Sequence, residues 1–177
     1  MKLIKFTVAA ALLTAGCSRE MWSPTDPSPA KLTVAADAAG RGQSASGHVD
    51  QTSSPFGLAV IDQYSFAAVR TPQGQINGQF EFRAKYQGLV VRAHGEVECL
   101  SINGNKARIA GRVTQSTFEG GIPTGSSLTW TVTDNDEPGR GRDTASQLLG
   151  APREVFCAGA AQYPEAPLRR GNIQVRP

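Results

Sequence analysis

Residues 76–85, Ile-Asn-Gly-Gln-Phe-Glu-Phe-Arg-Ala-Lys, decide the fold. Apolar or small side chains occupy every even position of this stretch, and polar or charged side chains occupy every odd position. Successive side chains of a β-strand point to opposite faces of the sheet, so a period of two is typical of a strand with one buried face. The stretch therefore predicts a strand whose even positions face a core.

The same alternation recurs on both sides of this strand. The residues predicted to face inward are Tyr64, Phe66 and Ala68; then Val91, Ala93, Gly95, Val97 and Cys99; then Ala107, Ile109, Gly111 and Val113; and last Leu128, Trp130 and Val132. Helical periodicity is absent from residues 40–177, so the alternation predicts an all-β domain.

The parity of the inward positions predicts the turns, because cross-strand partners must share a face. A two-residue turn at Gln87-Gly88 pairs Ala84 with Val91. A three-residue turn, Ile102-Asn103-Gly104, has its glycine in the left-handed conformation. This odd turn length keeps the inward residues of the next strand at odd sequence positions.

That register also places Glu98 beside Arg108 on the outer face, and it predicts a four-stranded antiparallel meander from about Gln63 to Thr114. Its charged outer face excludes a lipid-facing barrel wall. The inner face must therefore be buried by the sheet closing on itself or by a second sheet, which predicts an antiparallel sandwich or a closed barrel.

Composition narrows the class of protein. The chain has 177 residues, of which 40% are hydrophobic, enough for one core and too many for a disordered tail. The formal net charge is +3, from 18 basic and 15 acidic residues, and without Lys2 and Lys5 it is 16 against 15, or +1. Basic and acidic residues alternate along the strands, so we expect no nucleic-acid partner.

The first residues resemble a bacterial lipoprotein signal. Lys2 and Lys5 precede the apolar stretch Phe6 to Ala15, which is shorter than the roughly 20 residues of a membrane-spanning helix. Small residues then lead to Cys17, as in the lipobox, although Thr14 stands where leucine is commoner. The resemblance implies cleavage before Cys17 and lipidation of it; an ordinary secretory signal is the alternative. Ser18 after it, in place of the aspartate that favours inner-membrane retention, favours the outer membrane.

The domain organisation follows from this signal. We predict a signal peptide over residues 1–16, a lipidated and disordered tether over 17–38, and a single all-β domain over 39–177. Proline, serine and aspartate dominate the predicted tether, a composition that favours an extended chain over a packed one.

Export also bears on the cysteines. If Cys17 carries lipid, Cys99 and Cys157 remain as an even pair in an oxidising compartment, which favours a disulfide over two buried thiols. Such a bridge would stabilise the fold by about 4 kcal/mol in the chain-entropy model.

Two segments resemble a group of secreted or surface-anchored bacterial β domains without an assigned activity. The residues that carry the resemblance are Cys99-Leu100, Gly104-Asn105, Ala107 and Gly111 in one segment, and Thr131 to Asn135, Glu137 to Gly139, Asp143-Thr144 and Gly171 to Val175 in the other. The resemblance implies an all-β domain over roughly residues 47–177, with Gly171 to Val175 as a closing strand, and it implies no catalytic residue.

One acidic loop is a candidate cation site. Its oxygen-bearing side chains belong to Asp134, Asn135, Asp136, Glu137 and Asp143. Calcium takes six to eight oxygen ligands and is often bound by such loops. The alternative is a turn stabilised by neighbouring arginines and by side-chain bonds to the backbone, with no ion. Beyond this candidate calcium site, the sequence predicts no cofactor.

Two further groups of residues could carry chemistry. His94, Glu96 and Glu98 share the outer face of one strand, which would allow a zinc site or simply a solvated charged face. His48 and Asp50 form a His-x-Asp pair that could transfer a proton, or could serve only the fold.

These observations lead to three hypotheses. The first is a lipid-anchored, non-catalytic envelope protein whose partners are the membrane, through its lipid, and an unidentified envelope or surface component. The second is a carrier of a small apolar ligand, with a pocket lined by Tyr64, Phe66, Phe80, Phe82 and Trp130. The alternative for these aromatic residues is plain core packing, which is far commoner in proteins. The third is a metal-dependent hydrolase that uses the acidic loop.

Overall fold

Antiparallel strands dominate the computed structural model, which describes residues 42–53, 60–86, 88–135, 142–159 and 163–177. The elements are β1 (Gln43–Ser53), β2 (Val60–Arg70), β3 (Ile76–Tyr86), β4 (Leu89–Asn103), β5 (Lys106–Ser116), β6 (Ser127–Thr133), β7 (Thr144–Ala145), β8 (Leu149–Gly150), α1 (Arg153–Cys157), β9 (Ala166–Pro167) and β10 (Arg170–Arg176). In this part of the chain, no helix is long and apolar enough to cross a membrane.

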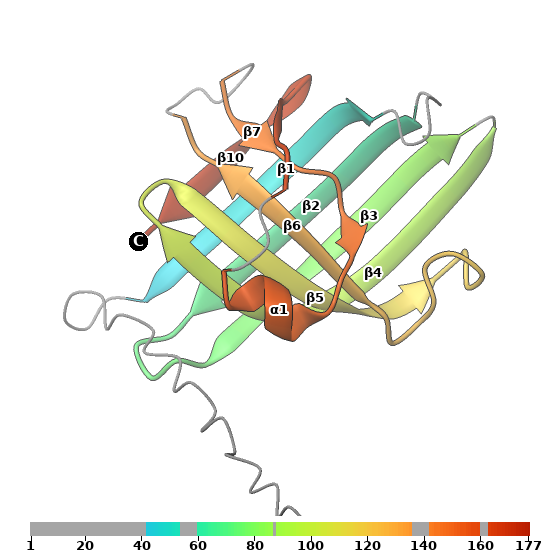
Figure 1. Ribbon diagram of the computed structural model, residues 1–177. Helices are drawn as coiled ribbons and strands as arrows, with labels where there is room; N and C mark the ends of the chain where they lie inside the picture. The colour runs from blue at the N-terminus through green and yellow to red at the C-terminus, as the bar shows by residue number, and fades with distance from the viewer. Residues whose placement is uncertain (1–41, 54–59, 87, 136–141, 160–162) are drawn as a thin grey trace, which may run out of the picture. The chain divides into compact units, whose positions relative to one another are not determined.

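The strands form one antiparallel sheet in the order β10-β1-β2-β3-β4-β5-β6-β7-β9, with β8 paired to β6 (Figure 1). The predicted four-stranded meander is β2 to β5, and the predicted pair Ala84 and Val91 is present. Gly88 has the positive φ of a tight turn, +86°, whereas Gln87 lies outside the described residues. The strand expected over Gly171 to Val175 is β10, which pairs with β1. The all-β, antiparallel prediction is confirmed.

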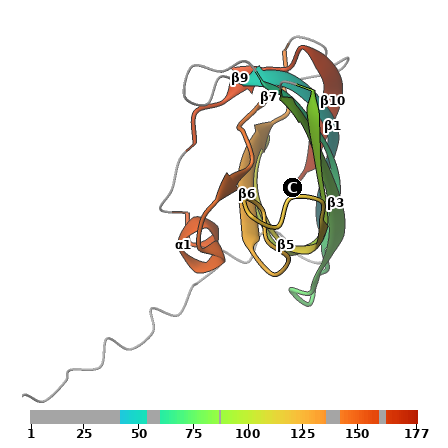
Figure 2. The same cartoon turned by 90° about the vertical axis from the view of Figure 1, so that its right-hand side faces the viewer.

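The sheet curls so that β5 and β6 lie across the core from β1 and β3 (Figure 2). Trp130 on β6 is fully buried, and its ring centroid lies 5.4–6.2 Å from those of Tyr64, Phe66 and Phe80 on β2 and β3. A Cβ at Gly95 or Gly111 would collide with the Phe80 ring, so glycine at these inward positions lets the aromatic core pack. The single curled sheet thus buries its own inner face.

The two edges of the curled sheet meet through carboxylates. The Asp143 Oδ2 atom accepts a 2.8 Å hydrogen bond from the backbone N–H of Ile173, and Asp134 Oδ2 accepts one of 2.9 Å from Val175. Both donors belong to β10, whereas Asp134 follows β6 and Asp143 precedes β7. The sheet is therefore closed at this end by side chains that satisfy an edge strand, in place of a backbone ladder.

The predicted turn between β4 and β5 is wrong in length. The turn has two residues, Gly104-Asn105, because Asn103 pairs with Lys106, although Gly104 does adopt the left-handed conformation with φ +60°. The register shifts between Val97 and Cys99, which leaves Glu98 as an extra, bulged residue in β4.

The bulge reverses the orientation of the last residues of β4. Leu100 and Ile102 enter the main core, and Cys99 faces the opposite side of the sheet, not the interior as predicted. Arg108 pairs with Ser101, so the predicted neighbourhood of Glu98 and Arg108 is also wrong. One inserted residue exchanges the two faces, because the side-chain period of a strand is two.

Cys99 faces outward to form a disulfide with Cys157 at the end of α1, with a Cα–Cα distance of 6.3 Å. A second apolar cluster of Cys99, Ala110 and Phe156 lies between the sheet and this helix, and Phe156 is fully buried. The predicted bridge is present, and it fixes a small helix that the alternation did not predict.

Candidate functional site

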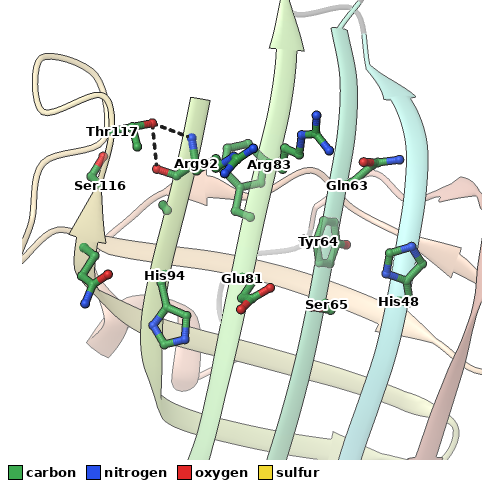
Figure 3. Close-up of a pocket in the computed structure, with 13 residues that line it drawn as sticks. His48, Gln63, Tyr64, Ser65, Glu81, Arg83, Arg92, His94, Ser116 and Thr117 are labelled. Carbon is green, nitrogen blue, oxygen red and sulfur yellow. Dashed lines mark hydrogen bonds between the residues drawn. The ribbon is translucent and has the colours of Figure 1, made fainter. Parts of the chain in front are cut away.

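A groove of about 590 Å³ crosses the outer face of β1 to β5 (Figure 3). Neighbouring strands are in register here, so they present two parallel rows of outward side chains, two residues apart along each strand. The groove lies on the polar side of the alternation from which the fold was predicted. The structure therefore places a candidate binding surface on the face opposite the aromatic core.

The first row of the groove runs across five neighbouring strands. Its members, as successive cross-strand partners, are His48, Ser65, Glu81, His94 and Gln115. Both histidines of the chain therefore belong to one row. Three strand spacings separate them, about 14 Å, which is too far for both to bind one metal ion.

The second row contains two arginines. Arg83 on β3 pairs directly with Arg92 on β4, and Gln63 on β2 is the next partner of Arg83. Figure 3 shows these three residues following one another across the strands. Thr117 borders the row, and its Oγ1 atom accepts a 2.9 Å hydrogen bond from the backbone N–H of Arg92. The groove is thus rich in hydrogen-bond donors beside one carboxylate, Glu81.

The predicted pair of His48 and Asp50 is divided between two environments. The Asp50 carboxylate is 4% exposed and accepts hydrogen bonds of 2.6 and 2.8 Å from the Arg169 guanidinium and one of 3.2 Å from Gln63 Nε2. His48 is exposed and lines the groove. The structure thus commits Asp50 to an ion pair at the sheet edge.

The predicted face of His94, Glu96 and Glu98 contains an ion-pair network. Glu98 accepts a 2.8 Å bond from Arg112 and a 2.7 Å bond from Arg153, and Glu96 lies 3.1 Å from Arg112. The hydrogen bond from Arg112 chiefly lowers the pKa of Glu98, with the positive charges of both arginines adding to it. Across the described ranges, no three His, Cys, Asp or Glu residues are arranged to hold a metal ion.

The described residues of the acidic loop have a structural role. Asp143 is fully buried, and its carboxylate accepts backbone hydrogen bonds from Asn135 and Ile173 at 2.9 and 2.8 Å. Asn135 itself donates to the carbonyl oxygen of Arg142 at 3.0 Å. These are the side-chain to backbone bonds of the alternative interpretation.

The calcium hypothesis stays a prediction, because Asp136 and Glu137 lie outside the described residues. Replacement of Asp143 cannot test it, since the variant would lose backbone hydrogen bonds with or without calcium. A thermal melt of the wild type in calcium and in chelator does test it: a ligand at 100 times its Kd stabilises a fold by about 2.7 kcal/mol.

The proposed lining of an apolar pocket is a packed core. Tyr64, Phe66, Phe80 and Trp130 are buried and contact one another, and Phe82 packs against the same cluster. The Tyr64 hydroxyl donates a 2.8 Å hydrogen bond to the carbonyl oxygen of Ser146, and burial raises the pKa of this tyrosine well above its usual value. The carrier hypothesis stays a prediction without a geometric argument in its favour.

The sequence contained a signal for the arginine pair. The predicted pairing of Ala84 with Val91 already places Arg83 opposite Arg92 and Glu81 opposite His94. It contained none for the approach of His48, because the partner of β1 could not be deduced from the alternation.

Known proteins offer no guide to this geometry. Scans of protein-family models, curated proteins and solved structures find no match to the chain. Cys17 lies outside the described residues, so its lipidation stays a prediction.

Proposed function

We propose that this chain is a lipid-anchored protein of the bacterial cell envelope, at the outer membrane, whose β domain is a non-catalytic binding module. The proposal rests first on the signal-like residues 1–16 and on Cys17. A disulfide between Cys99 and Cys157 is consistent with an oxidising compartment outside the cytoplasm.

One observation carries the binding role: the donor-lined groove on the outer face of β1 to β5. Charged and polar side chains on a sheet surface are normally paired with one another or solvated singly. Here Arg83 and Arg92 stand side by side in a concave surface of about 590 Å³, which is the size of a small-ligand site. The groove therefore supports recognition of a polar envelope component.

The anchor is tested by labelling cells with a fatty acid. We expect label in the wild type and none in Cys17→Ala, because the thioether-linked lipid requires the cysteine sulfur. Equal labelling of the two proteins would exclude lipidation at Cys17.

The binding role is tested with the full chain in non-ionic detergent and insoluble, delipidated envelope fragments, so that the lipid contributes nothing. Ser65 lies in the middle of the groove, and Ser65→Trp should fill it and abolish retention on the fragments. Val155, 53% exposed on α1, provides the matched control, since Val155→Trp adds an exposed indole outside the groove. Equal retention of all three proteins would contradict a binding role for this face.

A further inference from the structure

Arg83 and Arg92 are two positive charges that stand directly opposite each other on neighbouring strands. Directly opposite residues on one face of an antiparallel pair have Cβ atoms about 5 Å apart, and like charges there are destabilising. In the described part of the chain, neither guanidinium forms an ion pair, whereas Arg112, Arg153 and Arg169 each have a carboxylate partner. The pair is therefore left with unused donors that point into the groove.

The groups around the pair favour an anion. Gln63 and Thr117 flank the arginines, with Gln63 Nε2 donating to Asp50 and the Thr117 hydroxyl donating to the Arg92 carbonyl oxygen. Ser65, two residues along β2 from Gln63, adds a hydroxyl group to the lining. The carboxylate that lines the groove, Glu81, belongs to the neighbouring row, where its direct partner is His94. An anion between the two guanidiniums would remove the repulsion between them and would gain charge-assisted hydrogen bonds.

Two guanidinium groups side by side fit a phosphate group better than a carboxylate. A carboxylate has two oxygens, which one guanidinium can occupy in a bidentate pair. A phosphomonoester carries nearly two negative charges at neutral pH and has three terminal oxygens, so it can accept bonds from both Arg83 and Arg92. The number of guanidiniums therefore indicates the class of anion.

The other row indicates what the phosphate is attached to. His48, Ser65, Glu81 and His94 offer hydrogen-bond donors and acceptors along the groove. The aromatic residues of the lining, Tyr64 and Phe82, belong to the inward set and pack in the core, so they provide no surface for stacking a base. Hydroxyl groups match this row, and a nucleobase or an acyl chain does not.

We infer that the groove binds a phosphorylated sugar of the envelope, with its phosphate between Arg83 and Arg92 and its hydroxyls along the row from His48 to His94. The inference deepens the proposed function and rests on it. It assigns the ligand of the open outer face by charge complementarity and by the absence of an aromatic platform in the described lining.

Isothermal titration of the full chain in non-ionic detergent, with glucose 6-phosphate, inorganic phosphate and glucose as probes, tests the inference. We expect the sugar phosphate to bind more tightly than phosphate and glucose not to bind. Each of Arg83→Gln and Arg92→Gln should weaken binding about tenfold, as expected for loss of a charge-assisted hydrogen bond. Equal affinities for glucose 6-phosphate and phosphate would overturn the sugar assignment.

Arg112→Gln is the control, because it removes the same charge from an arginine that already has two glutamate partners. Its affinity should equal that of the wild type. Equal weakening in Arg112→Gln and Arg83→Gln would overturn the inference, since it would mean that bulk charge attracts the anion. A cooperative melt in every variant would show that the sheet is intact.

The envelope assay separates this inference from the proposed function. If the site binds phosphate, Arg83→Gln with Arg92→Gln should lose retention as Ser65→Trp does. Loss of retention in Ser65→Trp alone would overturn the phosphate assignment and leave the binding role standing. Retention in both variants would overturn both.

Discussion

The outer face of the sheet has two regions, called here the covered face and the open face, that differ in what packs over them. On the covered face, above β4 to β6, the disulfide holds α1 and β8 pairs with β6, and Phe156, Thr129 and Thr131 are fully buried. On the open face, above β1 to β5, Arg83 and Arg92 are exposed along the groove.

The difference shows that the alternation of polar and apolar residues does not determine whether a face is buried or exposed. Thr129 belongs to the outward set of β6, yet its hydroxyl contacts the Leu149 carbonyl oxygen at 3.0 Å and the Tyr163 hydroxyl at 2.8 Å. A polar residue can be buried when its cover supplies partners. We therefore expect substitutions on the covered face to change stability and substitutions on the open face to change binding.

The largest effect should come from the bridge that holds the cover. Replacing Cys99 and Cys157 with alanine together should lower the free energy of unfolding by about 4 kcal/mol, because a loop of this length loses much chain entropy when it is cross-linked. Urea unfolding without reductant measures this loss. A loss below about 1 kcal/mol would mean that the bridge contributes little to stability, which would contradict the first place that this comparison gives it.

The sheet closure provides the next largest effect. Asp143→Ala should cost about 3 kcal/mol, because it leaves two backbone N–H groups without their acceptor beside a fully buried position. Asp134→Ala, at a less buried residue whose carboxylate accepts the backbone N–H of Val175, should cost about 1 kcal/mol. Chemical denaturation of both variants in parallel tests the ranking, and equal losses would contradict it.

The regular part of the fold could be predicted because its side chains alternate strictly. The even set of β3, with Phe80 and Ala84, faces the core as the period requires. The prediction failed at Glu98, where one bulged residue exchanges the faces, because no residue type is unique to a bulge. Cys99 was consequently placed inside, although its pairing with Cys157 was predicted correctly.

Only part of the candidate site could be predicted from the sequence. The β3–β4 register, which depends on a local turn, places Arg83 opposite Arg92. The remaining features depend on contacts distant in sequence: β1 brings His48 to the groove, and β10 occupies the carboxylates of Asp134 and Asp143. Such long-range pairings carry little local signal.

A pH-dependent effect of moderate size should arise at Glu165, on the covered side. Burial raises the pKa of this carboxyl, but hydrogen bonds from Thr133, Thr144 and Lys106 outweigh burial, and the pKa is lowered from 4.5. A lowered pKa stabilises the fold above 4.5, and that contribution is lost as the pH falls below this value.

Glu165→Gln should therefore reduce stability by about 1 kcal/mol near pH 7. The difference from the wild type should shrink as the pH falls below 4.5. Unfolding curves across this range test the sign, and a difference that grows on acidification would contradict it.

The smallest change in stability should come from the open face. Arg83→Gln removes one of two like charges that stand directly opposite each other, so we expect the free energy of unfolding to stay within about 0.5 kcal/mol of the wild type or to rise slightly at low salt. Added salt screens the repulsion between Arg83 and Arg92, so it should raise the stability of the wild type more than that of the variant. Arg112→Gln should show the opposite dependence, because salt weakens the attraction to Glu96 and Glu98 that this variant has already lost. Melting the three proteins at low and high ionic strength compares a repulsive pair with an attractive network on one sheet, and a clear loss of stability in Arg83→Gln would mean that the open face serves the fold as the covered face does.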